Sequence, residues 1–304
     1  MAVLAKSPEV TVLMSVYNAE RYLTEAIESI LKQTFTDFEF IIIDDGSSDR
    51  SLQILQQYAR QDSRIQLVSR ENRGLVSSLN EGLALAKAPF IARMDADDIS
   101  YPDRLSKQVA FLKEHPDYAA IGCRVRLIDE DSDPLRLFSL ATTHQEIDTA
   151  HLQGEGGAIA HAAATFRKDK LNVIGRFRSE FTHAEDLDLW LRLAEVGQLG
   201  NLPDVLYDYR QHLQSVGHKY RAEQINSANN TLKEAFERRG LLNANFKAIE
   251  PPLSDENQLV LKWGWWALGA GNIKTARKYA LRAFKATPFS LEALKLCFCV
   301  IRGH

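Results

Sequence analysis

Short apolar runs recur along the first hundred residues, and each is followed by polar residues and then by apolar residues spaced three or four apart. Apolar runs of this length predict buried strands, and the three-to-four spacing predicts amphipathic helices. The predicted strands are residues 10–16, 38–43, 65–68 and 90–94, and the predicted helices begin near residues 20, 51 and 75. This alternation predicts βαβ units around a mostly parallel sheet that is buried on both faces.

The pattern is less regular after residue 100. Thr182 is expected to cap a helix, and the glycine-rich stretch 154–161 is expected to be a mobile loop. The other predicted elements are a helix over 102–115, a hairpin formed by 119–128 and 135–140, and strands over 162–166, 199–202 and 205–209. From residue 219 the pattern is almost wholly helical. We therefore place a boundary between an α/β domain, 1–218, and a helical extension, 219–304.

Polar residues gather directly after three of the predicted strands. Tyr17 and Asn18 follow the first strand, Asp44 and Asp45 follow the second, and residues 95–98 (DADD) follow the fourth. The carboxyl ends of parallel strands meet at one edge of a sheet, where ligands bind in folds of this kind. We therefore expect these three clusters to lie together.

The three carboxylates of Asp95, Asp97 and Asp98 predict a metal site. Mg²⁺ and Mn²⁺ take hard oxygen ligands, often one or two carboxylates with substrate phosphates and water completing the shell. The structural alternative is that these acids cap the next helix and solvate a turn. Neither the phosphate-binding P-loop pattern nor G-x-G-x-x-G after a strand occurs in the chain, so these two nucleotide-binding fingerprints are absent.

Taken in order, several segments resemble the motifs of family 2 glycosyltransferases. They are 12–18 (VLMSVYN), 41–49 (IIIDDGSSD), 72–74 (NRG) with Asn80, 91–98 (IARMDADD) followed by 102–105 (PDRL), and 183–193 (HAEDLDLWLRL). The match runs from about residue 10 to residue 215, roughly two-thirds of the chain. The resemblance implies the GT-A fold, an α/β fold with a mostly parallel sheet flanked by helices, here followed by a C-terminal helical extension. Residues 1–218 would then be the nucleotide-sugar-binding catalytic domain.

The resemblance also implies an activity and its partners. It implies hexosyl or N-acetylhexosaminyl transfer from a nucleotide-sugar donor, in the first place a UDP-sugar, in the biosynthesis of a cell-surface polysaccharide. The acceptor would be a hydroxyl group of a saccharide or of a lipid-linked glycan. The implied cofactor is Mg²⁺ or Mn²⁺.

Individual residues take roles through the same resemblance. Tyr17 would contact the base, Asp45 would accept a hydrogen bond from the uracil edge, and Asp95 would contact the ribose. The donor-binding set is Tyr17, Asn18, Asp45, Asn80, Asp95 and Arg210. Asp97 would bind the metal, with His212 as a second ligand, although a lone histidine in such a segment is more often structural. His161 could line the acceptor side.

Asp186 is the expected catalytic base. It matches the second acid of the family's Glu-Asp pair, and a carboxylate at this position can take the proton of the acceptor hydroxyl. Its place at a helix N-terminus is expected to keep it ionised near neutral pH. One base without a carboxylate nucleophile implies direct displacement with inversion. The alternative is that Glu185, Asp186 and Asp188 only complement the helix dipole, and we favour this role for Asp188.

Composition limits the possible partners. The chain has 304 residues and a formal net charge of −3, from 37 Lys and Arg against 40 Asp and Glu. This total argues against a nucleic-acid partner bound through bulk charge. Three cysteines, an odd number, predict reduced thiols. With no apolar run of eighteen residues and no signal-peptide pattern, we expect a cytoplasmic protein.

The charge is unevenly distributed. Residues 262–304 carry eight basic residues and one acidic residue, a net charge of +7, so the preceding part carries −10. Residues 263–288 faintly resemble one tetratricopeptide-type helical hairpin, which cannot bury its own apolar face alone. With the amphipathic segment 289–302, this region predicts peripheral contact with the inner face of the membrane, packing on the catalytic domain, or a homodimer. The plainer alternative is a packed helix with solvated lysines.

Three rival functions remain open. A glycoside hydrolase also uses two carboxylates but needs neither nucleotide nor cation. A sugar-nucleotide pyrophosphorylase has a related sheet, but it normally carries a glycine-rich, arginine-containing loop where this chain has Tyr17-Asn18-Ala19-Glu20. A helical interaction module with an inactive catalytic domain fits only the last third of the chain. We favour the glycosyltransferase because the motifs agree in combination.

Overall fold

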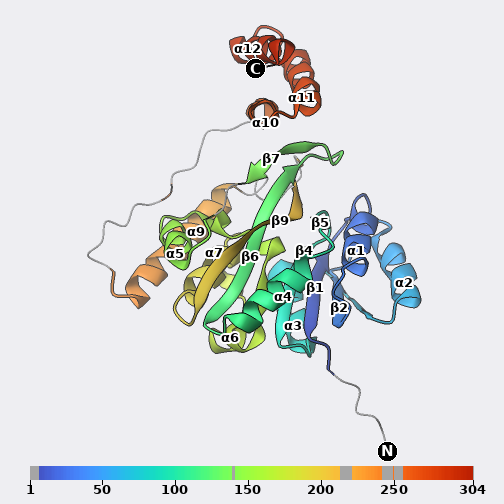
Figure 1. Cartoon of the computed structure of the whole chain (residues 1–304), viewed down its shortest axis with the longest axis vertical. Coiled ribbons are helices and arrows are strands. Elements are labelled where there is room, and N and C mark those ends of the chain that lie inside the picture. The colour runs from blue at the N-terminus through green and yellow to red at the C-terminus, as the bar shows by residue number, and fades with distance from the viewer. Residues whose placement is uncertain (1–6, 139–140, 213–220, 242–248, 250–255, 304) are drawn as a thin grey trace, which may run out of the picture. The chain divides into compact units, whose positions relative to one another are not determined.

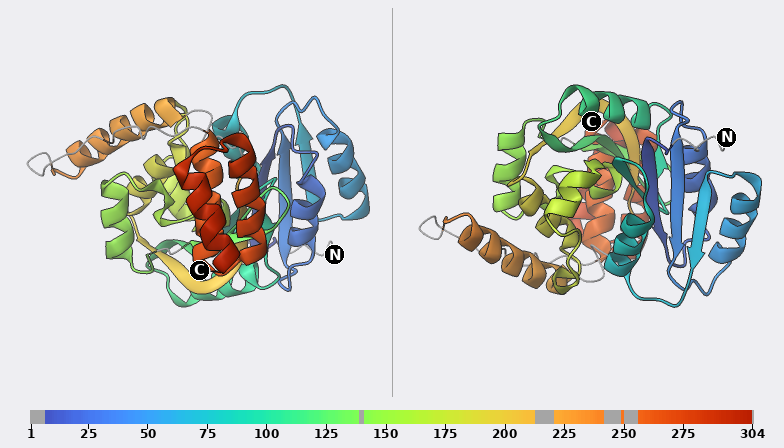
Figure 2. Two further views of the ribbon diagram at one scale, coloured as in Figure 1. Left: turned by 90° about the horizontal axis from the view of Figure 1, so that it is seen from above. Right: turned by 90° about the horizontal axis from the view of Figure 1, so that it is seen from below.

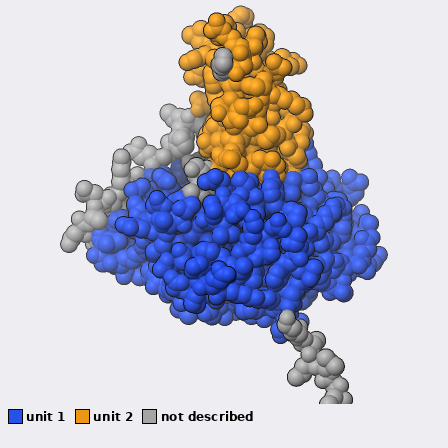
Figure 3. All heavy atoms as spheres, in the orientation of Figure 1, with its two compact units in different colours: residues 1–124, 140–207, 222–249 blue, residues 125–139, 208–221, 250–304 orange. Residues whose placement is uncertain are grey.

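The computed structural model describes residues 7–138, 141–212, 221–241, 249 and 256–303. The chain divides into two compact units (Figure 3). Unit 1 comprises residues 1–124, 140–207 and 222–249, and unit 2 comprises residues 125–139, 208–221 and 250–304. Neither unit is continuous in sequence, so the division differs from a single boundary at residue 218. The helix after residue 220 groups with unit 1, and the tip of the predicted hairpin groups with unit 2.

The secondary structure follows the predicted alternation of strands and helices (Figure 1). The strands are β1 (Val10–Val16), β2 (Phe38–Asp44), β3 (Ile65–Ser69), β4 (Phe90–Asp95), β5 (Ile99–Ser100), β6 (Tyr118–Ile128), β7 (Pro134–Phe138), β8 (Thr165–Arg167) and β9 (Gln198–Arg210). The helices are α1 (Leu23–Leu31), α2 (Ser51–Gln61), α3 (Leu75–Leu85), α4 (Arg104–Glu114), α5 (His144–Leu152), α6 (Lys168–Val173), α7 (Glu185–Leu193), α9 (Arg221–Arg238), α10 (Glu256–Gly269), α11 (Ile273–Ala286) and α12 (Leu291–Arg302). Short 3₁₀ helices cover Gly156–Ala158, His161–Ala163 and Ser179–Phe181.

Two strand predictions need correction. The short strand predicted over 162–166 is β8, which begins only at Thr165, because the residues before it form a 3₁₀ turn. The two strands predicted over 199–202 and 205–209 are the single strand β9. The residues between the two predicted strands, Pro203 among them, lie within β9. The end of the predicted strand 135–140 lies outside the described residues.

The sheet has the order β3-β2-β1-β4-β8-β6-β9-β5 among the described strands, and β7 pairs with β6. The pairs β1 with β2, β2 with β3 and β1 with β4 are parallel, whereas β8 is antiparallel to β4 and to β6. The chain therefore leaves β1 on one side, through β2 and β3, and returns as β4 on the other side. Such a reversal of strand order is the position at which open α/β sheets bind ligands.

The core of unit 1 lies on both faces of β1, β2 and β4. On one face, Leu13, Ile41 and Ile91 pack with residues of α3 and α7, including Leu79 and Trp190. Successive side chains of a strand point to opposite faces. The alternate residues Val12, Met14, Phe40, Ile42, Ala92 and Met94 are equally buried, with no measurable exposure. Both faces are therefore covered, as the continuous apolar runs predict, and Figure 2 gives two further views of this arrangement.

Unit 2 combines the β6–β7 hairpin tip with α10, α11 and α12. Trp263 of α10 meets Tyr279 of α11 edge-on, with ring centroids 5.5 Å apart. A Cβ atom on Gly264 would lie 2.5 Å from a methyl carbon of Leu296 in α12, so this glycine permits close packing of α10 and α12. The helical hairpin predicted in the last third of the chain is present as α10 and α11.

Basic side chains of α11 hold the acidic turn between β6 and β7. The Lys278 ammonium lies 2.6 Å from carboxylate oxygens of Asp129 and Asp131 and 3.3 Å from one of Asp133. Arg282 pairs with Glu130 at 3.1 Å. These acids raise the pKa of Lys278 above its ordinary value, against the effect of its partial burial. Part of the basic excess of the tail is therefore matched within unit 2.

We predict that His151 makes unit 1 sensitive to acid. Its ring is buried in α5 and stacks on Trp190 at 6.0 Å, and burial lowers its pKa to about 3. An unfolded histidine takes up a proton near pH 6.5. Below pH 6.5 the unfolded state therefore binds the extra proton, and this residue lowers the free energy of unfolding by about 1.4 kcal/mol for each further pH unit. Denaturant titrations from pH 7.5 to 5 should give a flatter pH dependence for His151→Phe than for the natural chain.

The exposed His115 provides the control for this measurement. His115→Phe should keep the acid sensitivity of the natural chain. An unchanged pH dependence in His151→Phe would contradict the assignment, since the substitution removes the titrating ring and keeps an aromatic surface for Trp190.

Candidate active site

The register of the sheet brings the predicted polar clusters to one edge of unit 1. Val16 at the end of β1 pairs with Asp44 at the end of β2, and Ser15 pairs with Asp95 at the end of β4. The residues that follow these three strands therefore leave the sheet side by side. The edge lies at the reversal of strand order between β1 and β4.

The loop after β1 is fastened to the loop after β2. The backbone N–H of Asn18 donates to the Ser47 hydroxyl at 3.0 Å, and the Asn18 side-chain oxygen accepts from the backbone N–H of Ser48 at 2.8 Å. Asn18 adopts a positive φ of 50°, a conformation that asparagine tolerates better than most residues. The adjacent Tyr17 is 56% exposed. Its ring is accessible at this edge, while the Asn18 side chain already has a structural partner.

Asp45 is buried and holds the loop before α3. Its carboxylate accepts hydrogen bonds from the backbone N–H groups of Arg73 at 2.9 Å and Gly74 at 3.0 Å, and it forms an ion pair with Arg70. Gly74 has a φ of 85° and directly precedes α3. Asp45 thus connects β2 to the start of α3, and its predicted contact with the uracil edge stays a prediction.

The acidic cluster lies at the end of β4. One carboxylate oxygen from each of Asp95, Asp97 and Asp98 can be chosen so that all three lie within 4.8 Å of one another. Burial raises the pKa of Asp95, and the Arg93 guanidinium opposes this shift. Close carboxylates that must remain charged need a cation. The set offers only hard oxygen donors, which fits a divalent cation such as Mg²⁺ or Mn²⁺.

Two residues beside this cluster were missed by the sequence analysis. Arg93 is 3% exposed in β4, and its guanidinium donates to the Asp95 carboxylate and to the backbone carbonyl of Met94. The buried Tyr207 of β9 places its hydroxyl oxygen 3.3 Å from the Asp95 backbone N–H, which donates to it. A charged residue inside an apolar strand is a signal that identifies Arg93 in principle. Tyr207 has no local signal, because it approaches from 112 residues away.

The start of α7 differs from the prediction. Thr182 does not cap the helix, since its hydroxyl donates to the Ser179 carbonyl at 3.1 Å and the N-cap position is Ala184. His183 turns the chain with a positive φ of 67°, so the helix begins at Glu185. The backbone N–H of Leu187 donates to the Asp186 carboxylate at 2.7 Å.

From the sequence we expected the helix N-terminus to keep Asp186 ionised near neutral pH. The structure corrects this expectation. Burial, followed by the neighbouring Glu185 carboxylate, raises the pKa of Asp186 to about 7, and Asp95 adds to the shift. The pKa of Glu185 is also raised by burial and by Asp95, while Arg93 lowers it. The Asp95 charge thus acts on both acids at the start of α7, which couples the acidic end of β4 to this helix electrostatically. A carboxyl that titrates near neutral pH is suited to accept a proton.

The glycine-rich stretch passes beside Asp186. A Cβ atom on Gly156 would lie 3.9 Å from a carboxylate oxygen of Asp186, so the backbone of this stretch passes close to the acid. The following 3₁₀ turn carries His161, whose ring contacts Phe166, Phe177 and Trp190. Burial and the nearby Arg93 lower the pKa of His161 well below its ordinary value. His161 is therefore neutral, and its place on the acceptor side stays a prediction.

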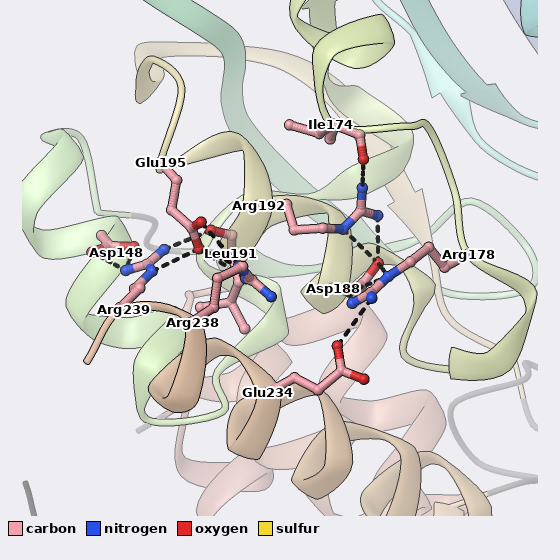
Figure 4. Close-up of polar contacts among 10 residues, drawn as sticks. All are labelled: Asp148, Ile174, Arg178, Asp188, Leu191, Arg192, Glu195, Glu234, Arg238 and Arg239. Atoms are coloured by element: carbon pink, nitrogen blue, oxygen red, sulfur yellow. Dashed lines mark hydrogen bonds and ion pairs between the residues drawn. The ribbon is translucent and has the colours of Figure 1, made fainter. Parts of the chain in front are cut away.

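Ion pairs fix α7 to its neighbours within unit 1 (Figure 4). Asp188 is 1% exposed and lies between the guanidinium groups of Arg178 and Arg192, whose Nε atoms are 3.1 and 3.0 Å from its oxygens. Arg178 also pairs with Glu234 of α9 at 2.9 Å. Asp188 therefore stabilises the helix that carries Asp186, in keeping with the structural role that we favoured, but through two arginines.

A second group in the same view ties α9 to α5 and α7 within unit 1. Arg239, directly after α9, donates to Asp148 of α5 at 2.8 Å and to the backbone carbonyl of Leu191 in α7 at 2.6 Å. Arg238 and Arg239 both pair with Glu195. Beneath these pairs, apolar residues of α7 and α9, including Leu191 and Leu232, form a small core. The helix α9, which the sequence analysis assigned to the extension, thus supports α7, the helix that carries Asp186.

Three predicted site residues have other contacts in the structure. The Asn80 amide donates to the Phe177 carbonyl at 2.8 Å and accepts from the Phe177 backbone N–H at 3.2 Å. Arg210 belongs to unit 2, where its guanidinium donates to Ser132 at 2.9 Å. His212 also belongs to unit 2 and is half-buried. Their parts in donor and metal binding stay predictions.

Comparisons with known proteins identify the family of this chain. A family model described as Glycosyl transferase family 2 matches residues 11–175. The putative glycosyltransferase EpsE of Bacillus subtilis is 38% identical over 211 residues, which cover 67% of this chain and 73% of that protein. The O-antigen biosynthesis glycosyltransferase WbnJ of Escherichia coli is 32% identical over 238 residues, which cover 77% of this chain and 91% of that protein.

Two solved structures share the fold. S. aureus TarS 1-349 in complex with UDP matches with a TM-score of 0.56 at 18% identity, over 97% of this chain and 92% of that one. The mannosyltransferase PcManGT from Pyrobaculum calidifontis in complex with GDP-Man and Mn²⁺ matches with a TM-score of 0.55 at 20% identity, over 98% and 81%. The family model and the relatives show that the chain belongs to the family 2 glycosyltransferases, and the solved structures show that it has the GT-A fold.

Proposed function

We propose that this chain is an inverting, metal-dependent glycosyltransferase that moves a hexosyl or N-acetylhexosaminyl group from a nucleotide donor to a hydroxyl group. The donor is in the first place a UDP-sugar, and the acceptor is a saccharide or a lipid-linked glycan of a cell-surface polysaccharide. The observation that carries the proposal is the cluster of Asp95, Asp97 and Asp98 together with Asp186, an acid whose pKa is raised to about 7 by burial, by Glu185 and by Asp95. The solved structure of TarS with UDP and the name of WbnJ support the donor and the pathway class.

The donor would bind along the ends of β1, β2 and β4. Tyr17 offers an exposed ring for the base, Asp45 lies at the end of β2, and Asp95 lies at the end of β4 for the ribose. We assign Asn18, Asn80 and Arg210 to the same donor-binding set.

Asp97 would hold the divalent cation with help from Asp95 or Asp98, and His212 is the proposed further ligand. When bound, Mg²⁺ or Mn²⁺ offsets the negative charge that develops on the departing nucleoside diphosphate. The structure of PcManGT with Mn²⁺ supports a metal in an enzyme of this fold.

Asp186 would take the acceptor proton. The acceptor oxygen forms its bond to the anomeric carbon as the bond from that carbon to the diphosphate oxygen breaks, and the proton passes to the Asp186 carboxylate. Attack from the side opposite the leaving group inverts the anomeric configuration. A Cβ atom on Gly156 would contact the Asp186 carboxylate at 3.9 Å, so we place the acceptor hydroxyl on the side of the carboxylate that the glycine-rich stretch passes.

A panel of UDP- and GDP-sugars tests the proposal, with release of nucleoside diphosphate measured in Mn²⁺, Mg²⁺ or EDTA. We expect release from a UDP-sugar that depends on the metal and increases with a saccharide acceptor. Hydrolysis of a simple glycoside without donor or metal would identify a glycoside hydrolase instead. Formation of a sugar nucleotide from a sugar phosphate and a nucleoside triphosphate would identify a pyrophosphorylase.

Asp97→Ala is expected to remove the dependence on metal together with the activity. Loss of the cation's charge at the leaving group should lower turnover about a thousandfold. Calorimetric titration of Mn²⁺ in the presence of UDP should show much weaker binding. The matched control is Asp117→Ala, which removes an exposed aspartate just before β6. If Asp97→Ala bound Mn²⁺ and turned over like the natural chain, the metal assignment would be wrong.

Asp186→Asn is expected to lower turnover about a hundred- to ten-thousandfold while donor and metal binding persist. In the natural chain the rate should fall about tenfold for each pH unit below about 7, because the protonated Asp186 carboxyl cannot accept a proton. The sign follows from the raised pKa, so activity is present above pH 7 and lost in acid. Measurements of kcat against pH check this.

Asp188→Asn, two residues along the same helix, separates catalysis from stability. It leaves Arg178 and Arg192 without their buried counter-charge, which should lower the free energy of unfolding by about 3 kcal/mol. Asp186→Asn should unfold no more readily than the natural chain, since it removes a carboxyl whose ionisation burial opposes. Equal turnover of Asp186→Asn and the natural chain would exclude Asp186 as the base.

A further inference from the structure

The helix α12 has apolar residues on two sides. One side carries Ala293, Leu296 and Val300, which are buried, and α12 packs along α11 and α10. The approach is close, since Leu296 occupies the space that a Cβ atom on Gly264 would need. The buried side accounts for the packing of α12 within unit 2. The apolar residues on the opposite side of the helix do not contribute to this packing.

The other side is unusually apolar for an exposed surface. Leu291 is 83% exposed, Leu294 43%, Phe298 57% and Ile301 80%, and Phe289 just before the helix is 96% exposed. The four helical residues are spaced three, four and three apart, so they form one stripe along α12. We call these five residues, together with Lys295 and Arg302, the outer face of α12. Contiguous exposed apolar residues of this kind mark an interaction surface.

The outer face also carries positive charge. Lys295 and Arg302 lie on the same side of the helix by their spacing from Leu291 and Phe298, and the Arg302 guanidinium lies 4.7 Å from the centroid of the Phe298 ring. Glu292 is the single acidic residue of α12. Within the described part of the chain Lys295 forms no ion pair, whereas Lys278 and Arg282 of α11 are occupied by the acidic turn. The positive charge of unit 2 that the acidic turn does not neutralise therefore includes the charge on the outer face.

Charge decides which partner fits this face. A second copy of the chain, related by a two-fold axis, would place the same patch against itself and bring Lys295 and Arg302 close to their own counterparts. An anionic lipid surface instead offers apolar chains to Phe289 and Leu291 and negative head groups to the cations. No described helix is long and apolar enough to cross a bilayer. In such a contact α12 would therefore lie along the lipid surface.

We propose that the outer face of α12 binds an anionic lipid surface. The helix lies in the plane of the head groups, with Phe289, Leu291, Phe298 and Ile301 inserted and with Lys295 and Arg302 at the level of the phosphates. The inference stands on unit 2 alone and does not depend on the proposed transfer reaction.

Flotation of the full chain with lipid vesicles tests the proposal. The vesicles are pure phosphatidylcholine, or phosphatidylcholine with one part in four of phosphatidylglycerol. The natural chain should float with the anionic vesicles and about tenfold less with the neutral ones, and high salt should weaken binding. The combined variant Phe289→Ser, Leu291→Ser, Phe298→Ser, Ile301→Ser should lose binding to both. Lys295→Gln with Arg302→Gln should lose the preference for anionic lipid and keep weak binding to both.

Val173→Ser is the matched control, because Val173 is 70% exposed on α6 of unit 1 and should not affect flotation. All substituted side chains are exposed, so circular dichroism melting curves should match that of the natural chain. Failure of the natural chain to float with anionic vesicles, or equal flotation by the serine variant, overturns the proposal. Sedimentation velocity tests the rival occupant. A dimer that the serine substitutions dissociate, in a chain that binds no lipid, identifies a second copy instead.

Discussion

Repulsion among carboxylates is the constraint on which the arrangement of unit 1 depends. The parallel register gathers Asp45 and the acids of the β4 end at one edge, and the start of α7 adds Glu185 and Asp186. Like charges held this close and partly out of water destabilise the fold unless cations oppose them. The cation that opposes the charge of Asp45 is Arg70, and the cation that opposes the charge of Asp95 is Arg93. Both arginines are themselves nearly buried, so their charges act at short range and with little screening.

The acids of α7 show how the same residue type is used in two ways. Asp188 is neutralised by two arginines and anchors the helix, whereas Asp186 has no arginine partner among the described residues and its proton affinity is raised. A charge that is fully paired contributes to stability but is unavailable for proton transfer. The ion pairs of Asp188 and those from α9 hold α7 in place, which allows the unfavourable environment of Asp186 to persist.

The sequence predicted those parts of the fold that depend on local patterns. The apolar runs of β1, β2 and β4 are continuous, so their burial on both faces followed directly, whereas β3 is an edge strand of which only Ile65 is buried. The parallel pairing followed from the alternation of strands and helices, and the positions of Tyr17, Asp45 and Asp95 followed from the strand ends. The contacts of Tyr207 with Asp95 and of Asn80 with Phe177 join residues 112 and 97 positions apart. No local pattern encodes such contacts. The predicted cap of α7 was wrong because His183 adopts a positive φ of 67° and Ala184 takes the N-cap position, a turn that the prediction did not include.

The acidic turn of unit 2 has the alternating carboxylates Asp129, Asp131 and Asp133, a spacing that resembles an oxygen cage for a cation. In this chain the positive charge at its centre is the Lys278 ammonium, which is covalently part of the protein. A chelator cannot remove that charge, and no exchange with solvent ions is needed to keep the turn folded. Among the described residues, this turn therefore has its counter-charge built into the chain, whereas the acidic cluster at the end of β4 is the one that we propose binds a divalent cation.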